Sequence, residues 1–366
     1  MTLVPSRHAF VDYSKGICIV LVVLMHATLG VEKAAGTLTW LHPFIEWARP
    51  FRMPDFFFIS GLFVASRIGR PWRGYLDAKV LHFAYFYVLW LTVQVLLRAP
   101  GLAADGGAGA VAGAWLLGLV DPYGTLWFIY MLALFFVVIK LLEGVPPLIV
   151  FVAGALLQMC HIETGWLIVD EFAARFVYFY AGYRMAPAVF AFAASLAARS
   201  SPLLAAALLC WATINALVVQ SGVSMTTGVG LTLGFLGTAA VITTGALLSR
   251  TRLAAPLRYC GANSIVIYLA FFVFMAGTRT WLLNGPLASD LGAVALLATV
   301  AGVAGPILLY WATRGSCLSF LFRRPDWARL APTRLGSCRV AAQPAQIEAG
   351  RLGLRLTFRP RLTVRR

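Results

Sequence analysis

The stretch that decides the fold is GICIVLVVLMHATLGV, residues 16–31, an apolar run interrupted by His26. Such a run approaches the roughly 20 residues with which a helix crosses a bilayer. Similar runs recur along most of the chain, whose 366 residues are 60% hydrophobic and 12% charged. Soluble domains are about 45–50% apolar and about 25% charged. The composition therefore excludes an ordinary soluble enzyme and predicts an integral membrane protein.

The apolar runs are too long for the alternating strands of a membrane barrel, so we expect an all-α, polytopic membrane helical bundle. About ten transmembrane helices can be placed, and several are short enough that their ends should extend into flanking residues. They are residues 16–31, 51–66, 80–97, 125–142, 147–159, 173–186, 203–220, 229–248, 264–283 and 291–312. The small-residue stretch 101–120 is predicted as a loop with a re-entrant or interfacial piece.

The basic side chains fall unevenly on the two sides that ten spans create. With the N-terminus in the cytoplasm, twelve lie on the cytoplasmic side before residue 314 and six on the opposite side. The positive-inside rule therefore predicts a multi-pass protein of the inner (plasma) membrane with both termini in the cytoplasm. The first run has a polar start and no small-residue cleavage site, so we expect a retained span rather than a signal peptide.

The C-terminal part of the chain differs sharply in composition from the rest. Residues 314–366 hold twelve arginines, no lysine and two acidic residues, which accounts for most of the net charge of +16. The apolar runs cease there, so we divide the chain into a transmembrane domain, residues 1–322, and a basic tail, residues 323–366, that should be disordered. The lipid bilayer is an expected partner, and nucleic acid is not.

Three ionisable residues share one face of the first predicted span. Lys15 precedes His26 by eleven residues, about three full helical turns, and Asp12 lies within about 40° of the same line. An ionisable side chain inside a span is costly and marks a functional hypothesis. A neutral imidazole suits a general base, and Lys15 suits an anion near the cytoplasmic surface. The alternative is an interfacial Asp12–Lys15 ion pair and a structural hydrogen bond from His26.

Four stretches of the chain occur together, in order, in a known family of membrane enzymes. They are DYSKGI at residues 12–17 with the aliphatic run to His26, RPFRMPDFFFISGLF at residues 49–63, LWF at residues 126–128, and GANSIVIYL at residues 261–269. In this order they resemble the membrane-bound acyltransferase-3 family, in which a basic residue precedes an essential His by ten intervening residues. Lys15 stands where Arg is usual, and Phe271 stands where a His often follows the fourth motif.

The resemblance implies an integral membrane O-acyltransferase. The donor would be acyl-CoA, acetyl-CoA above all, used as a co-substrate from the cytoplasm, with no tightly bound cofactor. The acceptor would be a hydroxyl of a carbohydrate or glycolipid. In this hypothesis His26 is the general base, Lys15 positions the donor, and Asp12 orients Lys15 or balances its charge.

Further residues are candidates for binding donor or acceptor. They are Arg67, Arg70, Arg73 and Lys79 on the predicted cytoplasmic side, Arg49 and Arg52 on the opposite side, and Ser60, Trp127, Asn263, Ser264 and Tyr268 within the motifs. The cytoplasmic group suits the phosphates of coenzyme A or serves only as a topology anchor. The opposite group suits an anionic or hydroxyl-rich acceptor or snorkels to the interface. No residue spacing predicts a metal site.

Two other classes of function stay open. A secondary transporter or flippase for a small anion or glycan precursor would use the same intramembrane Asp, Lys and His as a proton relay. It would show proton-coupled flux without consuming an acyl donor. A catalytically inactive scaffold is the third interpretation, and the departures at Lys15 and Phe271 favour it.

Overall fold

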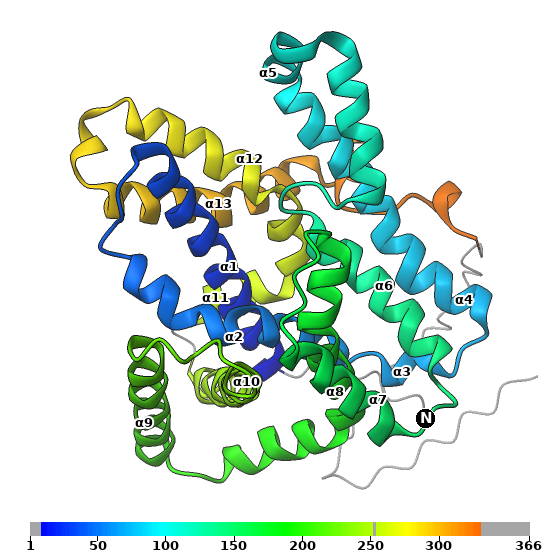
Figure 1. The fold of residues 1–366 in the computed structure, drawn as a ribbon, viewed down its shortest axis with the longest axis vertical. Helices are drawn as coiled ribbons and strands as arrows, with labels where there is room; N and C mark the ends of the chain where they lie inside the picture. Colours follow the sequence, from blue (N-terminus) through cyan, green and yellow to red (C-terminus); the bar gives the residue numbers. More distant parts are fainter. Residues whose placement is uncertain (1–8, 252–253, 331–366) are drawn as a thin grey trace, which may run out of the picture. The chain divides into compact units, whose positions relative to one another are not determined.

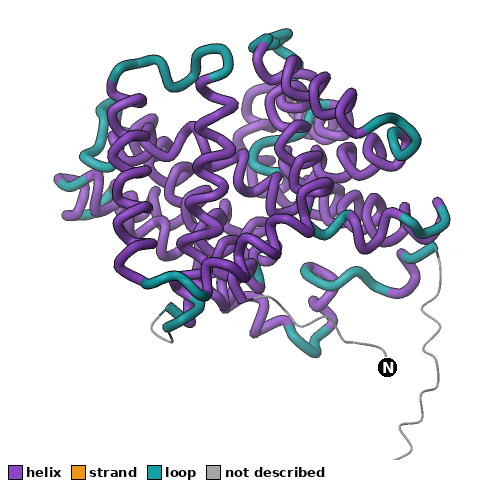
Figure 2. Tube along the Cα trace, turned by 90° about the horizontal axis from the view of Figure 1, so that it is seen from below, coloured by secondary structure: helices purple, strands orange, loops and turns teal. Residues whose placement is uncertain are grey.

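The structure is a computed structural model that describes residues 9–251 and 254–330. In this part of the chain every regular element is a helix, so the predicted all-α class is confirmed (Figure 2). The elements are α1 (Ala9–Ala35), α2 (His42–Gly61), α3 (Ala65–Ile68), α4 (Trp72–Leu76), the π-helical turn η1 (Asp77–Leu81), α5 (His82–Val120), α6 (Trp127–Leu141), α7 (Pro147–Met159), α8 (Leu167–Ala197), α9 (Ser201–Gln220), α10 (Val229–Leu248), α11 (Ala255–Ala262), α12 (Ser264–Leu283), η2 (Pro286–Ser289), α13 (Leu291–Thr313), η3 (Cys317–Leu321) and η4 (Asp326–Ala328).

Each of the ten predicted spans lies on a separate helix, namely α1, α2, α5 to α10, α12 and α13. Six described helical segments are long and apolar enough to cross a membrane, and α6 and α7 are shorter apolar helices. The helices α2 and α8 are long but carry more charged side chains, such as Arg49, Arg52 and Arg175. The membrane class is thereby supported, while the count of ten crossings stays a prediction.

The stretch 101–120 is helical, so the prediction of a loop was wrong, while a re-entrant or interfacial position of this stretch stays a prediction. It belongs to α5, where Gly106 and Gly107 depart from helical geometry and divide the helix into two arms. The indole of Trp115 donates to Thr92 Oγ1 across the arms at 2.9 Å, which shows that they run antiparallel. Figure 1 shows the resulting helical hairpin at the end of α5. Small residues allow two helical arms to approach closely, and the turn needs only two glycines.

The first helix lies at the centre of the bundle (Figure 1). It packs against α2, α10, α11, α12 and α13. Its side chains Cys18, Ile19 and Val23 are fully buried, as expected of a largely apolar helix with neighbours on several sides. The helix begins and ends beyond the predicted span, so Asp12, Lys15 and His26 lie on one continuous element.

The start of α13 is tied to the connection between α1 and α2. The Asp290 carboxylate accepts hydrogen bonds from the Ala293 N–H and from the Trp40 indole, each at 3.0 Å. These hydrogen bonds, the Ala293 bond first, hold the pKa of Asp290 below its usual range. Both bonds favour the charged form, so the cap is present above that lowered value and is lost as the pH falls through it.

The first residues of the predicted basic tail pack against η1. Arg324 is 7% exposed and forms an ion pair with Asp77 at 2.9 Å. The Leu330 N–H donates to the same carboxylate at 2.8 Å. The remainder of the tail, with Arg7 and Arg252 from the topology argument, lies outside the described residues.

Candidate functional site

His26 lies within the bundle and is half-buried. Its ring centroid is 5.4 Å from that of Phe271 on α12. The charged group whose field reaches the imidazole is Arg52 on α2. Among the described residues, no hydrogen bond engages the His26 ring. The structural hydrogen bond of the alternative interpretation is therefore not observed among the described residues.

The second and third motifs meet through their aromatic rings. Phe56 on α2 stacks on Phe128 on α6 with ring centroids 4.5 Å apart and planes at 11°. The neighbouring Phe57 lies 6.0 Å from the Trp127 ring. Offset-stacked rings of this kind stabilise a pair beyond the area they bury. Trp127 and the phenylalanines of the second motif are thus part of one packed cluster.

The third and fourth motifs meet through Tyr268. Its buried hydroxyl donates to the Thr125 carbonyl and accepts from the Phe128 N–H at 3.2 Å. Three residues further along α12, Phe271 contacts His26. A chain of contacts thus joins the second, third and fourth motifs to one another and, through Phe271, to His26.

We expect Tyr268→Phe to lower the free energy of unfolding by about 1–3 kcal/mol, because a buried carbonyl and a buried N–H both lose their partner. Thermal unfolding in detergent would measure the change. Tyr259→Phe is the control, since that exposed hydroxyl accepts from Trp311 at 2.6 Å and water can replace it. If both variants lose the same free energy of unfolding, the Tyr268 hydroxyl stabilises the contact between the motifs no more than an exposed hydroxyl would.

Four basic side chains from different parts of the chain lie within electrostatic reach of Lys79 or are Lys79 itself. Lys15, Arg67 and Arg70 all act electrostatically on Lys79, so they share one neighbourhood. We call Lys15, Arg67, Arg70 and Lys79 the donor-side cluster. Lys15 Nζ lies 4.8 Å from the Phe63 ring centroid, and Lys79 Nζ lies 4.6 Å from that of Phe136. Sequence reasoning grouped three of these residues, and the structure adds Lys15 to them.

The remaining candidates on this side have other contacts. Arg73 donates to the Leu330 carbonyl at 3.3 Å. Asp12 is 6% exposed, and its carboxylate lies 3.7 Å from Arg258 Nε on α11. Arg258 lies ten residues after the end of the predicted span 229–248, so no local sequence signal indicates this pairing. Asp12 therefore has a cationic neighbour besides Lys15.

Three motif residues direct their polar groups into or along their own helices. The Ser60 hydroxyl donates to the Phe56 carbonyl at 2.7 Å within α2. Asn263 stands at the N-cap of α12, but its side chain donates back to the Tyr259 carbonyl at 2.9 Å. Ser264 is half-buried at the first position of α12. No described contact brings these three side chains to His26.

The two arginines of the second motif differ in environment. Arg49 is exposed and pairs with Glu46 at 3.2 Å. Arg52 is 7% exposed and donates to the Ile45 carbonyl at 3.2 Å, while its Nε has no partner. Of the two, only Arg52 is buried, and it acts electrostatically on His26.

Sequence reasoning missed Asp55, which lies inside the second motif. It is fully buried, accepts a hydrogen bond from Thr238 at 2.9 Å, and its second oxygen has no partner. A carboxylate inside a predicted span is itself a functional signal, so the sequence contained the information. Asp55 directly precedes the three phenylalanines by which the second motif is recognised, and it is not itself part of that signature.

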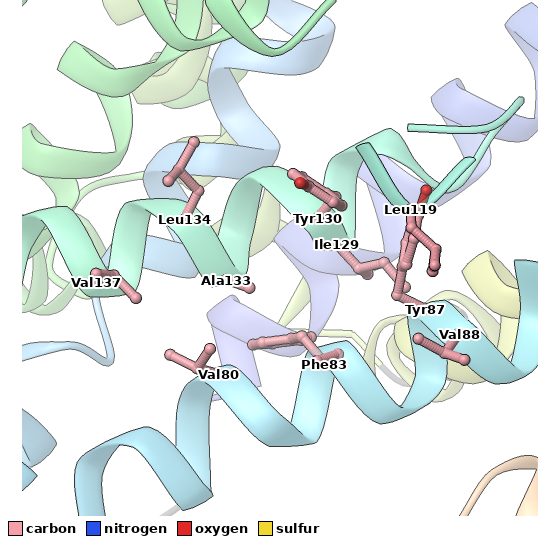
Figure 3. Close-up of a pocket in the computed structure, with 11 residues that line it drawn as sticks. Val80, Phe83, Tyr87, Val88, Leu119, Ile129, Tyr130, Ala133, Leu134 and Val137 are labelled. Atoms are coloured by element: carbon pink, nitrogen blue, oxygen red, sulfur yellow. The ribbon is translucent and has the colours of Figure 1, made fainter. Parts of the chain in front are cut away.

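An apolar cavity of about 330 Å³ lies between α6 and the helical stretch of η1 and α5. Figure 3 shows the side chains of Val80 and Phe83 across from Ala133 and Val137 of α6. Its lining suits a hydrocarbon chain, and His26 is not among the lining residues. Elsewhere in the described chain, no group of three or more His, Cys, Asp or Glu side chains could hold a metal ion.

Comparisons with known proteins agree with the motif order. The model of the acyltransferase domain of the acyltransferase-3 family matches residues 8–311. The inner membrane protein YcfT of Escherichia coli (strain K12) is 27% identical over 187 residues, which cover 44% of this chain and 51% of that protein. The chain thus spans about half the length of this relative, and no solved structure matches it. The match to the family model covers most of the chain, which therefore belongs to the acyltransferase-3 family of membrane proteins.

Proposed function

We propose that this protein transfers an acyl group, acetyl in the first instance, from acyl-CoA to a hydroxyl of a carbohydrate or glycolipid acceptor, with His26 as general base. The observation that supports it best is a half-buried imidazole with no hydrogen bond among the described residues, in the first of four family motifs that a chain of contacts joins. General bases must be within reach of a hydroxyl proton and uncommitted to structure.

The donor-side cluster supports a coenzyme A site. Arginine and lysine side chains bind phosphates through charge-assisted hydrogen bonds, and coenzyme A has a 3′-phosphate and a pyrophosphate. Eleven residues separate Lys15 from His26 on one helix, about 16 Å at about 1.5 Å per residue. The extended pantetheine arm would bridge this distance and deliver the thioester to the imidazole. Because the donor comes from the cytoplasm, the donor-side cluster and both termini would face that side of the membrane.

The proposed chemistry is a single acyl transfer. The imidazole of His26 accepts the proton of the acceptor hydroxyl while the oxygen attacks the thioester carbonyl. The carbon–sulfur bond breaks, the ester forms, and the coenzyme A thiolate takes up the proton from the imidazolium. Lys15 acts on the donor phosphates and does not touch the reacting atoms. Asp12 supports the charge of Lys15 and is a positioning residue.

Removing the exposed cations of the donor-side cluster should weaken donor binding. We expect the double change Arg67→Ala and Arg70→Ala to raise KM for acetyl-CoA by about 10- to 100-fold with kcat nearly unchanged, because these contacts bind ground and transition state alike. Steady-state kinetics at two ionic strengths would measure it. Arg199→Ala, an exposed arginine between α8 and α9, is the control. A fall in kcat alone would contradict a phosphate-binding role.

Labelled acetyl-CoA tests the function itself. Purified protein should consume it and pass the label to a glycan or glycolipid fraction, identified by mass spectrometry of surface glycans with and without the protein. Proton-coupled flux of an anion in proteoliposomes without acyl consumption would instead establish the transporter alternative and overturn the proposal.

A further inference from the structure

We infer that the acceptor carries an oxyanion, a phosphate or carboxylate group, which Arg52 and Arg175 hold beside His26. The inference rests on the proposed function, because it names the chemical class of that acceptor. Neither the motif comparison nor the family match identifies Arg175, which lies on α8.

Arg52 is a buried cation with unused donor capacity. Only 7% of its surface is exposed, its one described hydrogen bond goes to the Ile45 carbonyl, and its Nε is buried without a partner. A guanidinium has five N–H donors and no acceptor. A buried charge is costly unless it is paired and hydrogen-bonded. The side chain is thus prepared for an anion that the described residues do not supply.

The carboxylates nearby already have their own partners. Glu46 pairs with Arg49 at 3.2 Å, and Glu171 pairs with Arg175 at 3.1 Å. The Arg175 guanidinium also acts on Arg52 as a like charge. Glu46 and Glu171 therefore face three guanidiniums. The buried Asp55, three residues after Arg52, accepts a hydrogen bond from Thr238, and no ion pair joins it to Arg52 among the described residues. An incoming oxyanion would balance this excess charge.

The position of the pair fits an acceptor site. Arg52 is the charged group whose field reaches His26, so an anion held there lies near the base. Arg175 is 22% exposed and Arg49 is 55% exposed, so this part of the bundle is partly open. The donor-side cluster lies beyond the opposite end of α2. Donor and acceptor would thus reach the imidazole from different ends of that helix. Two forked guanidiniums can hold one oxyanion bidentately and fix the orientation of its hydroxyl.

Titration with inorganic phosphate tests the site without any acyl transfer. The protein is purified in detergent with Arg67→Ala and Arg70→Ala, so that the donor-side cluster does not bind the probe. In this background Arg175→Gln should weaken phosphate binding about tenfold or more, because a charge-assisted hydrogen bond is lost. Lys33→Gln, an exposed cation at the end of α1, should leave it unchanged. Arg52→Lys keeps the charge but loses the fork, so binding should weaken without vanishing.

Nanodiscs distinguish the two sources of such a group. Stabilisation by phosphatidylglycerol over phosphatidylcholine, lost in Arg175→Gln, would identify a lipid headgroup, whereas phosphate binding alone would indicate a soluble acceptor. If neither anion binds in a way that depends on Arg175, or if Lys33→Gln weakens binding equally, the inference is wrong. Failure of the proposed function would show separately, as absence of label transfer from acetyl-CoA with phosphate binding intact.

Discussion

Replacing His26 with alanine should lower the rate of acyl transfer from acetyl-CoA by about 10²- to 10⁴-fold, the usual contribution of a positioned general base. The thermal unfolding temperature should change little. The imidazole has no hydrogen bond among the described residues, so its removal leaves no buried donor or acceptor without a partner. Initial rates on matched amounts of folded protein measure the effect, and binding of acetyl-CoA should persist.

The exposed His161 provides the matched control. It lies in the connection after α7 and hydrogen-bonds the Met159 and Met225 carbonyls at 2.9 and 2.7 Å. His161→Ala should keep full transfer activity. An unchanged rate in His26→Ala would remove the general base from the mechanism and favour the scaffold interpretation.

Replacing Gly182 with alanine should lower the free energy of unfolding by about 1–3 kcal/mol, the usual cost of overpacking. A Cβ at Gly182 would lie 2.0 Å from the Phe58 carbonyl oxygen, and one at Gly61 would lie 2.2 Å from that of Phe179. The two glycines therefore let α2 and α8 approach backbone to backbone. A methyl group would separate these helices, and Arg52 would move away from Arg175 with them.

Gly277 on α12 is the control for this prediction. A Cβ there meets no other atom within 4 Å, so Gly277→Ala should be neutral or stabilising by about 0.5–1 kcal/mol through helix propensity. Thermal or denaturant unfolding in detergent compares the two variants. If both respond alike, close contact between α2 and α8 does not stabilise the fold.

Much of the architecture could be predicted from local sequence. The run containing His26 must form a helix in a bilayer, because only a helix satisfies every backbone group within one segment. Helical periodicity then places Asp12, Lys15 and His26 on one face without any tertiary information. The helical hairpin of α5 was missed because a run of alanines and glycines lacks the apolar length that predicts a span, and its glycines lower the helix propensity.

The site was predictable only in part. His26 and the four motifs could be named from their order, and Asp55 could have been found as a carboxylate inside a span. The hydrogen bonds of Tyr268 to Thr125 and Phe128, and the pairing of Arg258 with Asp12, join segments far apart in the chain. Such contacts depend on how helices cross and have no local sequence code.

The sequence by itself determined that this chain is a membrane helical protein of the acyltransferase-3 family with one histidine inside its first helix, since hydrophobic length and helical period are local properties. Only the tertiary structure decided which side chains surround that histidine. Two glycines allow α2 and α8 to touch, and this packing places Arg52 and Arg175 within electrostatic reach of each other. Contacts between helices depend on packing, and packing is a property of the whole bundle.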